Sequence, residues 1–528
     1  MSPRHPANLD DPAPPARAVV ASYNPDARAA GAAALDDGGN DFDAFVATTL
    51  VEYVVAPGVT SLAGPLTALA FHAATGERAY LDAELDHVAD RAGMWAPGEP
   101  AGKGVMVPGA LPGLAALHAR HGALPWPRLV QPAIDLAERG FAIDDGYAAM
   151  IAYRAAALGS SQHGRRTFFR AGEPLPAGAV LRQPELADLL RRIAADGAAA
   201  MQTGAWAARC VAAVQERGGR MQASDLAGYR PRWLPPRHVR YRGFDVFGAA
   251  GRSYGGMWTL SALQALAHGE VAPGPHFTAD PERLERMVRV ALALWDEPAL
   301  FDTAVLDSDE RAAAQLSPAA GRAVWQRALG AAPTTAPDRR GSHSFHVVVV
   351  DRHGNAVTGT NTINSVPWAD GVFVDGVPLT NFMAHEGNAT RPGERRRTPM
   401  SSHLVFDDGR LFAAAGTCNS SLMEAGWQLL VNALDHRATA LAAATLPRFG
   451  TFAFDDDDPG RARGALWLDP AVDAAVVERL RRRGLAFEQQ GGFVDTGSGA
   501  IVLRAADGTV TAGLLPLAGY DGLPTYRR

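Results

Sequence analysis

The chain has 528 residues, a formal net charge of −6 at pH 7 and two cysteines, Cys210 and Cys418. It contains no Lys/Arg-rich block, which argues against a nucleic-acid partner, and two cysteines cannot form a disulfide framework. The first residues combine acidic side chains with prolines instead of a basic end followed by an apolar run, and no apolar stretch of about 18 residues occurs. We therefore expect a cytoplasmic protein with no membrane-spanning segment.

The first part of the chain is predicted to be mainly helical. Residues 1–17 are proline-rich and are expected to be disordered. Residues 26–55 have the pattern of two helices broken at Gly38-Gly39. Between about residues 109 and 220, successive helical patterns each end at a glycine, the usual helix stop: "PGLAALHARHG", "PRLVQPAIDLAERG", "PELADLLRRIAADG" and "TGAWAARCVAAVQERGG".

The character of the chain changes after residue 330. Before it, "FDVFGAA" (residues 244–250) predicts a strand, and helical patterns continue to about residue 329. Residues 330–343 are rich in Pro, Gly and Thr without periodicity, which predicts a flexible linker. The segments after it favour strands, with one helix at residues 421–436: residues 345–351, 356–364, 401–416, 464–469 and 499–515. Two separate domains, or one layered sandwich whose halves share a core, would both fit.

The segment "FHVVVVDRHGNAVTGTNTIN" predicts a hairpin. A nearly continuous apolar run is typical of a strand covered on both faces, and "RHG" fits a three-residue loop with Gly354 in the left-handed conformation. Asp351 then pairs with Asn355, which places Ser344 opposite Thr362. Because side chains alternate along a strand, one face should carry these residues: Ser344, His346, Thr358, Thr360, Thr362 and Asn364.

Ser344 stands where the first of these strands begins. A serine nucleophile needs a base, and His346 lies two residues on, roughly 7 Å away along a strand. The α-amino group of Ser344 itself would serve if the bond between His343 and Ser344 were cut, since a free α-amine has a pKa of roughly 7.7–8. Spacing alone favours the alternative, in which Ser344 is an ordinary residue at the start of a strand beside β-forming threonines.

A second serine competes for the role of nucleophile. "GRSYG" (residues 251–255) lies between a predicted strand and a predicted helix, which is the context of a nucleophile elbow. The preceding 240 or so residues are mostly helical, however, and lack the repeated β/α units of that fold. The alternative is a glycine-rich loop between a strand and a helix.

Several long segments in order resemble the γ-glutamyltranspeptidase family of N-terminal-nucleophile hydrolases, from about Ala18 to Tyr520. They are "VVASYNPDARAAGAAALDDGGNDFDAFVA", "VPGALPGLAALHARHGALPWPRLVQPAIDLAERGF", "SDLAGYRPRW" with "YRGFDVFGAAGRSYGG", and "VVVVDRHGNAVTGTNTIN". The third segment ends in the family's Ser-Gly-Gly loop, which weakens the elbow hypothesis for Ser253.

The resemblance implies an α+β fold, a four-layer αββα sandwich, made as one precursor that cuts itself. Residues 18–343 would form the large subunit and residues 344–528 the small subunit, and the two fragments would stay associated. Ser344 would be the nucleophile that forms an acyl-enzyme, where the family usually has threonine. Thr362 matches the threonine that supports the nucleophile's amine, and Asn364 matches a substrate-contacting asparagine. The backbone N–H groups of Asn419 and Ser420 match an oxyanion hole in which the family has Gly-Gly.

The departures from the family fall on substrate recognition. The arginine that grips the substrate α-carboxylate falls at Glu84, and a carboxylate repels the anion that arginine attracts. The acidic residues that hold the α-amino group fall between Phe382 and His385, and the first of a serine pair falls at Thr398. We therefore expect an amide other than glutathione, with space for a cationic group facing Glu84.

Three hypotheses follow: a self-processing amidohydrolase or acyltransferase with a non-glutathione substrate, an orthodox γ-glutamyl enzyme, and an uncut, non-catalytic binding protein. The expected partner is a small-molecule amide. No cofactor or metal is expected, because no glycine cluster is followed by the Lys-Ser/Thr of a phosphate loop and no zinc-ligand spacing occurs.

Overall fold

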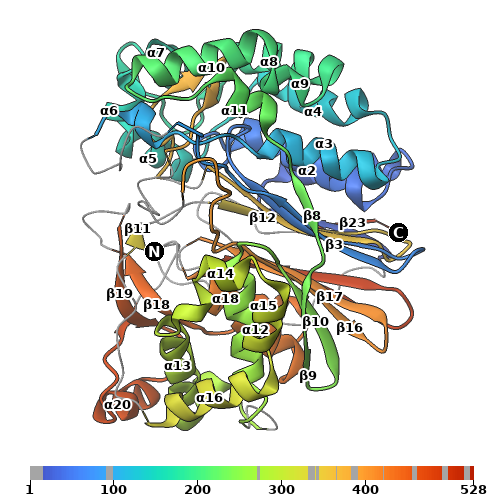
Figure 1. Cartoon of the computed structure of the whole chain (residues 1–528), viewed down its shortest axis with the longest axis vertical. Helices are drawn as coiled ribbons and strands as arrows, with labels where there is room; N and C mark the ends of the chain where they lie inside the picture. Colours follow the sequence, from blue (N-terminus) through green and yellow to red (C-terminus); the bar gives the residue numbers. More distant parts are fainter. Residues whose placement is uncertain are drawn as a thin grey trace.

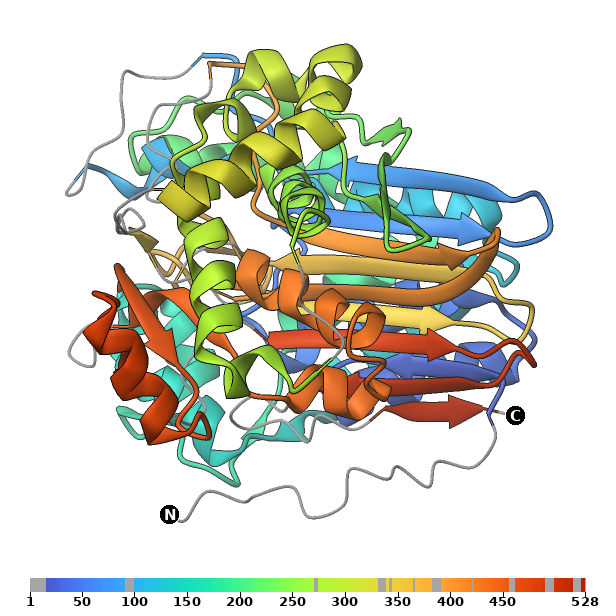
Figure 2. The ribbon, with the colours of Figure 1, turned by 90° about the horizontal axis from the view of Figure 1, so that it is seen from below.

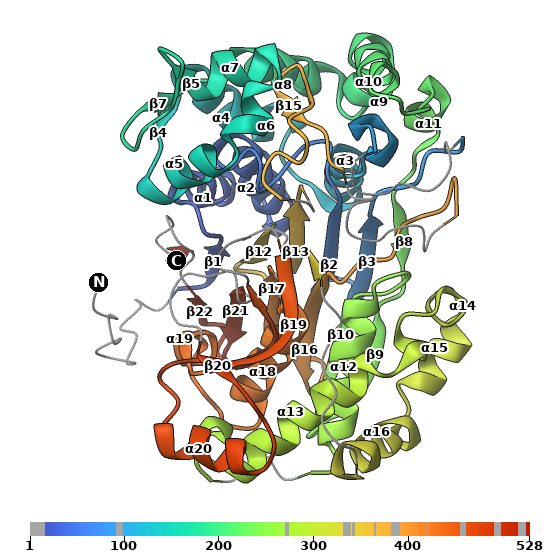
Figure 3. The same ribbon diagram turned by 90° about the vertical axis from the view of Figure 1, so that its left-hand side faces the viewer.

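Four layers stack in the order helices, sheet, sheet, helices (Figures 1 and 3). The α+β class and the αββα sandwich expected from the sequence are therefore confirmed. The computed structural model describes residues 16–90, 99–269, 274–330, 339–340, 344–363, 366–381, 391–419, 421–454, 461–489, 498–515 and 524–527.

In the first sheet, the predicted hairpin lies between two strands from the N-terminal part of the chain. Among the described residues this sheet has seven strands, in the order β23 (Thr525–Arg527), β1 (Ala18–Ala21), β12 (Ser344–Val350), β13 (Ala356–Thr362), β2 (Leu66–His72), β3 (Glu77–Ala83) and β8 (Arg232–Leu234).

The second sheet packs against the first. Its described strands follow the order β22 (Val510–Leu514), β21 (Ser498–Arg504), β17 (Arg410–Cys418), β16 (Ser401–Asp407), β10 (Phe244–Gly248) and β9 (Arg237–Tyr241). Apolar side chains from both sheets fill the space between them, among them Leu69 and Val348 from the first and Leu404 and Phe406 from the second. Their burial supplies the main driving force that holds the two sheets together.

Helices cover the outer face of the first sheet. Asn24 caps α1 and Asn40 caps α2, and the predicted break at Gly38-Gly39 is confirmed. The main helices of this layer are α1 (Pro25–Asp36), α2 (Asp41–Val55), α3 (Ala110–His121), α4 (Trp126–Arg139), α8 (Pro184–Asp196) and α10 (Gly204–Glu216).

A second helical layer covers the other sheet, and Figure 2 shows its yellow-green and orange helices lying across the strands. It contains α12 (Tyr254–Leu266), α13 (Pro281–Trp295), α16 (Pro318–Gly330), α18 (Leu422–Leu434) and α19 (Ala440–Thr445). A smaller sheet lies beside it, formed by β11 (Arg339–Arg340), β19 (Arg461–Leu468), β18 (Phe449–Phe454) and β20 (Glu488–Gln489), with α20 (Ala474–Arg482) next to α13.

Short elements connect these layers. They are η1 (Ala101–Gly104), β4 (Phe141–Ala142), α5 (Asp145–Tyr153), α6 (Ala155–Gly159), α7 (Gln162–Phe168), β5 (Phe169–Arg170), β6 (Glu173–Pro174), β7 (Val180–Leu181), α9 (Ala199–Gln202), α11 (Ala223–Gly228), η2 (Phe277–Ala279), η3 (Pro298–Leu300), α14 (Thr303–Leu306), α15 (Asp309–Gln315), β14 (Phe373–Val374) and β15 (Val377–Pro378).

Both sheets mix strands from the two sides of residue 344. β12 and β13 lie between β1 and β2, and β16 pairs with β10. Of the two architectures that the sequence left open, the sandwich with a shared core is therefore the correct one. Of the linker at residues 330–343, the structure describes Gly330, which ends α16, and β11, which pairs with β19.

The expected disorder of residues 1–17 is wrong for the last two. Ala16 forms a β-bridge with Val510, and the Arg17 N–H donates to the carbonyl of Arg527. Ala16 thus pairs with β22 of the second sheet and Arg17 with β23 of the first, so both residues have paired backbone groups. Residues 1–15 lie outside the described part of the chain.

Candidate active site

The hairpin has the predicted loop and register. The Asp351 N–H donates to the Asn355 carbonyl, and Gly354 has a φ of 82°, a left-handed value that suits glycine. The pairing runs from Val350 with Ala356 to Ser344 with Thr362. The first residue of β12 therefore lies directly opposite the last residue of β13.

The two faces of the hairpin also divide as predicted. His346 contacts Thr358 and Thr360 through its two ring nitrogens, at 2.7 and 2.8 Å, and the Thr358 hydroxyl donates to the Ala415 carbonyl in the second sheet. On the opposite face, the Asn361 amide donates to Glu52 of α2 at 2.5 Å. The face that carries Ser344 and the threonines therefore points between the two sheets.

Ser344 is buried, with 6% of its surface exposed. Its backbone N–H donates to the side-chain oxygen Oδ1 of Asn419, 3.1 Å away. The next ring along the strand, Phe345, lies 5.6 Å from the ring of Tyr23, between centroids. In the uncut chain this N–H belongs to the peptide bond that follows His343, and cleavage of that bond would leave the nitrogen as an α-amino group beside Asn419.

Asn419 adopts the backbone conformation that a glycine would supply. Its φ is 74°, in the left-handed region, and asparagine tolerates this region better than most other residues that carry a Cβ. It follows the last residue of β17 and precedes the N-terminus of α18, whose positive end favours a developing negative charge. Asn419 thus has a left-handed backbone, the conformation that glycine adopts freely.

His346 is a poor base in this environment. Burial, and to a smaller extent the neighbouring His403, lower its pKa from 6.5 to about 3. The ring therefore stays neutral at neutral pH, and both of its nitrogens already contact threonine hydroxyls. This leaves the α-amino group as the better candidate to take a proton from the Ser344 hydroxyl.

Ser253, the competing serine, caps a helix. Its hydroxyl accepts a bond from the Gly256 N–H at 3.2 Å and donates to the Met400 carbonyl at 2.6 Å, and only 1% of the residue is exposed. Its φ of −78° is ordinary. An N-cap serine committed to two backbone partners does not have the exposed hydroxyl of a nucleophile elbow.

Glu84 is buried and paired within the chain. Its two carboxylate oxygens accept from Nε and Nη2 of Arg396, both at 2.8 Å, and one of them also accepts the Leu85 N–H. The expectation of a carboxylate open to a cationic substrate group therefore has to be corrected, because the guanidinium of Arg396 takes that place.

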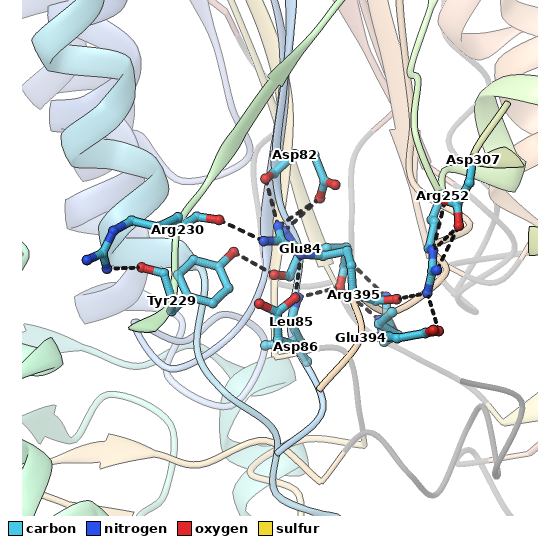
Figure 4. A network of polar contacts seen from close by, with 11 residues as sticks. Asp82, Glu84, Leu85, Asp86, Tyr229, Arg230, Arg252, Asp307, Glu394 and Arg395 are labelled. Atoms are coloured by element: carbon cyan, nitrogen blue, oxygen red, sulfur yellow. Dashed lines mark hydrogen bonds and ion pairs between the residues drawn. The ribbon is translucent and has the colours of Figure 1, made fainter. Parts of the chain in front are cut away.

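Residues around this pair tie the segment before β16 to the end of β3. Arg395 contacts Asp82 and Asp86 at 3.1 and 2.6 Å (Figure 4). Arg252 donates to the Arg395 carbonyl at 2.6 Å. These bonds fix the path of the chain that leads to Thr398.

Thr398 is buried at the end of that segment. It forms a β-bridge with Ser253, and its hydroxyl accepts the Met400 N–H at 3.2 Å. The Arg396 N–H donates to the Leu85 carbonyl, so the structure brings the regions of Thr398 and Glu84 together. His343, Asn364, Phe382, His385 and Ser420 lie outside the described residues.

Sequence reasoning missed two buried charges near the site. Arg396 lies within "GERRRTPM", and a run of arginines is usually a solvated surface. Glu52 lies inside an apolar helix, where burial raises its pKa from 4.5 to about 7 although bonds from Ser22 and Asn361 lower it. A lone glutamate in an otherwise apolar helical stretch was the available signal for the second.

The described residues show neither a metal-binding cluster nor a membrane-spanning helix. They contain no group of three or more His, Cys, Asp or Glu side chains placed to hold a metal ion. None of the described helices is long and apolar enough to cross a membrane.

Comparisons with known proteins find similarity over most of the chain. The family model Gamma-glutamyltranspeptidase matches residues 27–514. The Acylase ACY 1 proenzyme of Pseudomonas sp. (strain SE83) is 29% identical over 512 residues, covering 90% of this chain and 88% of that protein. The Glutathione hydrolase proenzyme of Escherichia coli (strain K12) is 26% identical over 475 residues, covering 82% and 80%. The crystal structure of cephalosporin acylase from Bacillus halodurans superposes with a TM-score of 0.81 at 22% identity, over 99% of this chain and 98% of that one.

Proposed function

The chain belongs to the γ-glutamyltranspeptidase family, and we propose that it cuts itself before Ser344 and then uses this serine to form an acyl-enzyme from an amide other than glutathione. It is a γ-glutamyltranspeptidase-like hydrolase or acyltransferase, since its relatives include acylases and glutathione hydrolases. The names of those relatives describe proenzymes, which supports processing into two fragments that stay associated.

One observation carries the choice of Ser344: it is the first residue of β12, and its nitrogen and Thr362 lie at the same end of the hairpin. Cleavage before it would create an amine next to its own hydroxyl. That amine takes the hydroxyl proton as Oγ attacks the amide carbon, and returns a proton to the leaving amine as the C–N bond breaks. Water or another amine then releases the acyl group.

The substrate proposal depends on Glu84 and Arg396. A buried carboxylate and a buried guanidinium that share two bonds form a pair with no net charge. Such a pair offers neither a free cation for an α-carboxylate nor a free anion for an α-ammonium. The donor is therefore an amide whose acyl group lacks the γ-glutamyl zwitterion.

The orthodox γ-glutamyl activity is the second candidate. Arg396 places a guanidinium at Glu84, the position where the family has an arginine, and a substrate carboxylate that displaced Glu84 would find a partner there. This requires breaking a bidentate buried pair, which costs several kcal/mol when one partner is left alone.

A series of three p-nitroanilides tests the proposal. γ-Glutamyl anilide carries both charged groups, glutaryl anilide lacks the α-amino group, and pentanoyl anilide lacks both. We expect the protein to release nitroaniline from at least one of the last two faster than from the first, and the Ser344→Ala variant to release none. Fastest release from γ-glutamyl anilide would instead establish the orthodox activity.

A further inference from the structure

The side chain of Asn419, as well as its backbone, lies at the candidate nucleophile Ser344. Its oxygen Oδ1 lies 3.1 Å from the nitrogen of Ser344, only 3% of the residue is exposed, and the contact joins β12 to the turn between β17 and α18. Building on the proposed function, we propose that the Asn419 side-chain amide is the acceptor that holds and orients the α-amino group of Ser344 for proton transfer. Asn419 is thus a positioning residue of the nucleophile.

Asparagine meets two structural requirements at this position: a left-handed backbone and a side-chain acceptor for the Ser344 nitrogen. With a φ of 74°, the backbone here is one that glycine adopts freely and that asparagine adopts more readily than other residues with a Cβ. A glycine would supply only the backbone N–H for the oxyanion. Asparagine keeps this N–H and adds a carbonyl acceptor directed at the attacking residue.

The acceptor restricts the direction of the amine's lone pair. A neutral –NH₂ group that donates one hydrogen to Oδ1 has its lone pair on another side, where it can take the proton of Oγ as the Oγ–C bond forms. The resulting –NH₃⁺ keeps the bond to Oδ1 and gives a different proton to the leaving nitrogen. The amide oxygen itself gains and loses no proton in either step.

Ionisable groups lie around this amine on each packed element. Tyr23 follows β1, Cys418 ends β17, and Arg448 precedes β18. Burial raises the pKa of Tyr23 above its ordinary value, Cys418 adds to this rise, and the charge of Arg448 opposes it only in part. His346 on β12 and His403 on β16 are neutral at neutral pH, because burial lowers the pKa of each to about 3. Glu52 of α2 contacts the far face of β13 through Asn361.

The acceptor has a predictable effect on the amine. A bond to Oδ1 stabilises the charged –NH₃⁺ more than the neutral –NH₂, so it raises the pKa of the amine. Burial of Ser344 and the positive end of α18 both act in the opposite direction. Removal of the acceptor alone should therefore lower the amine pKa, and replacement by a carboxylate should raise it.

The test is the pH dependence of acyl-enzyme formation in three variants, measured on protein whose cleaved fraction is known from intact mass. Asn419→Gly and Asn419→Ala should both move the acidic midpoint down by about one pH unit and slow the step about ten-fold. The alanine variant should also be less stable than the glycine variant, because alanine carries a Cβ that disfavours the left-handed backbone and glycine does not. Asn419→Asp should move the midpoint up by about one unit.

The outcomes separate this proposal from the proposed function. If the glycine and aspartate variants act more slowly with the wild-type midpoint, Asn419 has a merely structural role and the proposal is wrong. If the Asn419→Gly variant does not cut itself, the proposal is tested by the pH midpoint of Asn419→Asp against that of wild type. A wild-type protein that neither cuts nor acylates contradicts the proposed function itself, and does so before any variant is compared.

Discussion

Arg396 donates from Nε and Nη2 to the two carboxylate oxygens of Glu84, each over 2.8 Å, and neither side chain is more than 1% exposed. The two residues come from opposite sides of residue 344. If the chain is cut there, this pair becomes a bond between two fragments, close to the segment that leads to Thr398. The absence of net charge on this pair is the basis for our proposal that the substrate acyl group lacks the γ-glutamyl zwitterion.

Removal of one partner of this pair should destabilise the protein strongly. Glu84→Gln or Arg396→Gln leaves a buried charge alone, which costs about 3–5 kcal/mol. The double variant with both of these changes should cost less than the two single changes together, because neither buried charge is left without its partner. Urea unfolding measures all of these. Glu478→Gln, which removes an exposed partner of Arg482 at 4.0 Å, is the control and should leave the midpoint unchanged. Additive losses would show that the pair is not coupled.

Glu52 should make stability depend on pH. Its pKa is raised from 4.5 to about 7 by burial, so between these values the folded state holds a proton that the unfolded state has lost. Its contribution is complete below pH 4.5 and disappears as pH rises through 7, a change of about 3 kcal/mol. The free energy of unfolding of Glu52→Gln, minus that of wild type, should therefore grow from pH 5 to pH 8.

This difference isolates Glu52 from other buried groups. His346 and His403, with pKa values of about 3, have the opposite effect, because the unfolded state takes up protons below pH 6.5. Wild type and Glu52→Gln both contain these two histidines, so their effect on the free energy of unfolding cancels in the subtraction. A difference that is flat with pH would mean that the Glu52 carboxyl has an ordinary pKa in the folded protein.

The same histidines should not titrate near neutral pH. NMR spectra of protein labelled at histidine should show the ring resonances of His346 and His403 unchanged between pH 5 and pH 8, in the neutral form. A histidine peptide in the same buffer, which titrates near pH 6.5, is the reference. A transition of His346 within that range would restore it as a candidate base.

Thr362 should matter through its hydroxyl. It is fully buried opposite Ser344, and Thr362→Val keeps the shape while removing the oxygen. We expect self-cleavage to slow about 10²-fold. Thr48→Val, which removes a hydroxyl bonded to the Ala44 carbonyl within α2, is the matched control and should cut at the wild-type rate. Equal rates in the two variants would contradict a role for Thr362.

Local patterns were enough to predict the hairpin. The loop residue Gly354 and the alternation of the second strand set the register, so the pairing of Ser344 with Thr362 followed without any distant contact. The strands β2 and β3 were missed, because "LTALAFHAATGERAYLDA" is rich in alanine and has few β-branched residues. β2 pairs with β13 and β3 pairs with β2, and only the assembled sheet shows why this region forms strands.

Contacts between distant segments could not be predicted from pattern. Glu84 and Arg396 are 312 positions apart, and the sequence suggested a free carboxylate at Glu84 without indicating its partner. Likewise, the bond between Ser344 and the Asn419 side chain depends on how β17 packs against β12. The substrate roles assigned to Asn364, Phe382, His385 and Thr398 stay predictions, whereas the open carboxylate expected at Glu84 is corrected by its pair with Arg396.

The most direct test of the central claim is the intact mass of the purified protein on a denaturing separation, for wild type and for Ser344→Ala. We predict two wild-type fragments that divide between His343 and Ser344 and elute together under native conditions, and a single uncut chain for the variant. A wild-type chain that stays whole after long incubation, or a variant that is cut at the same bond, would contradict the account.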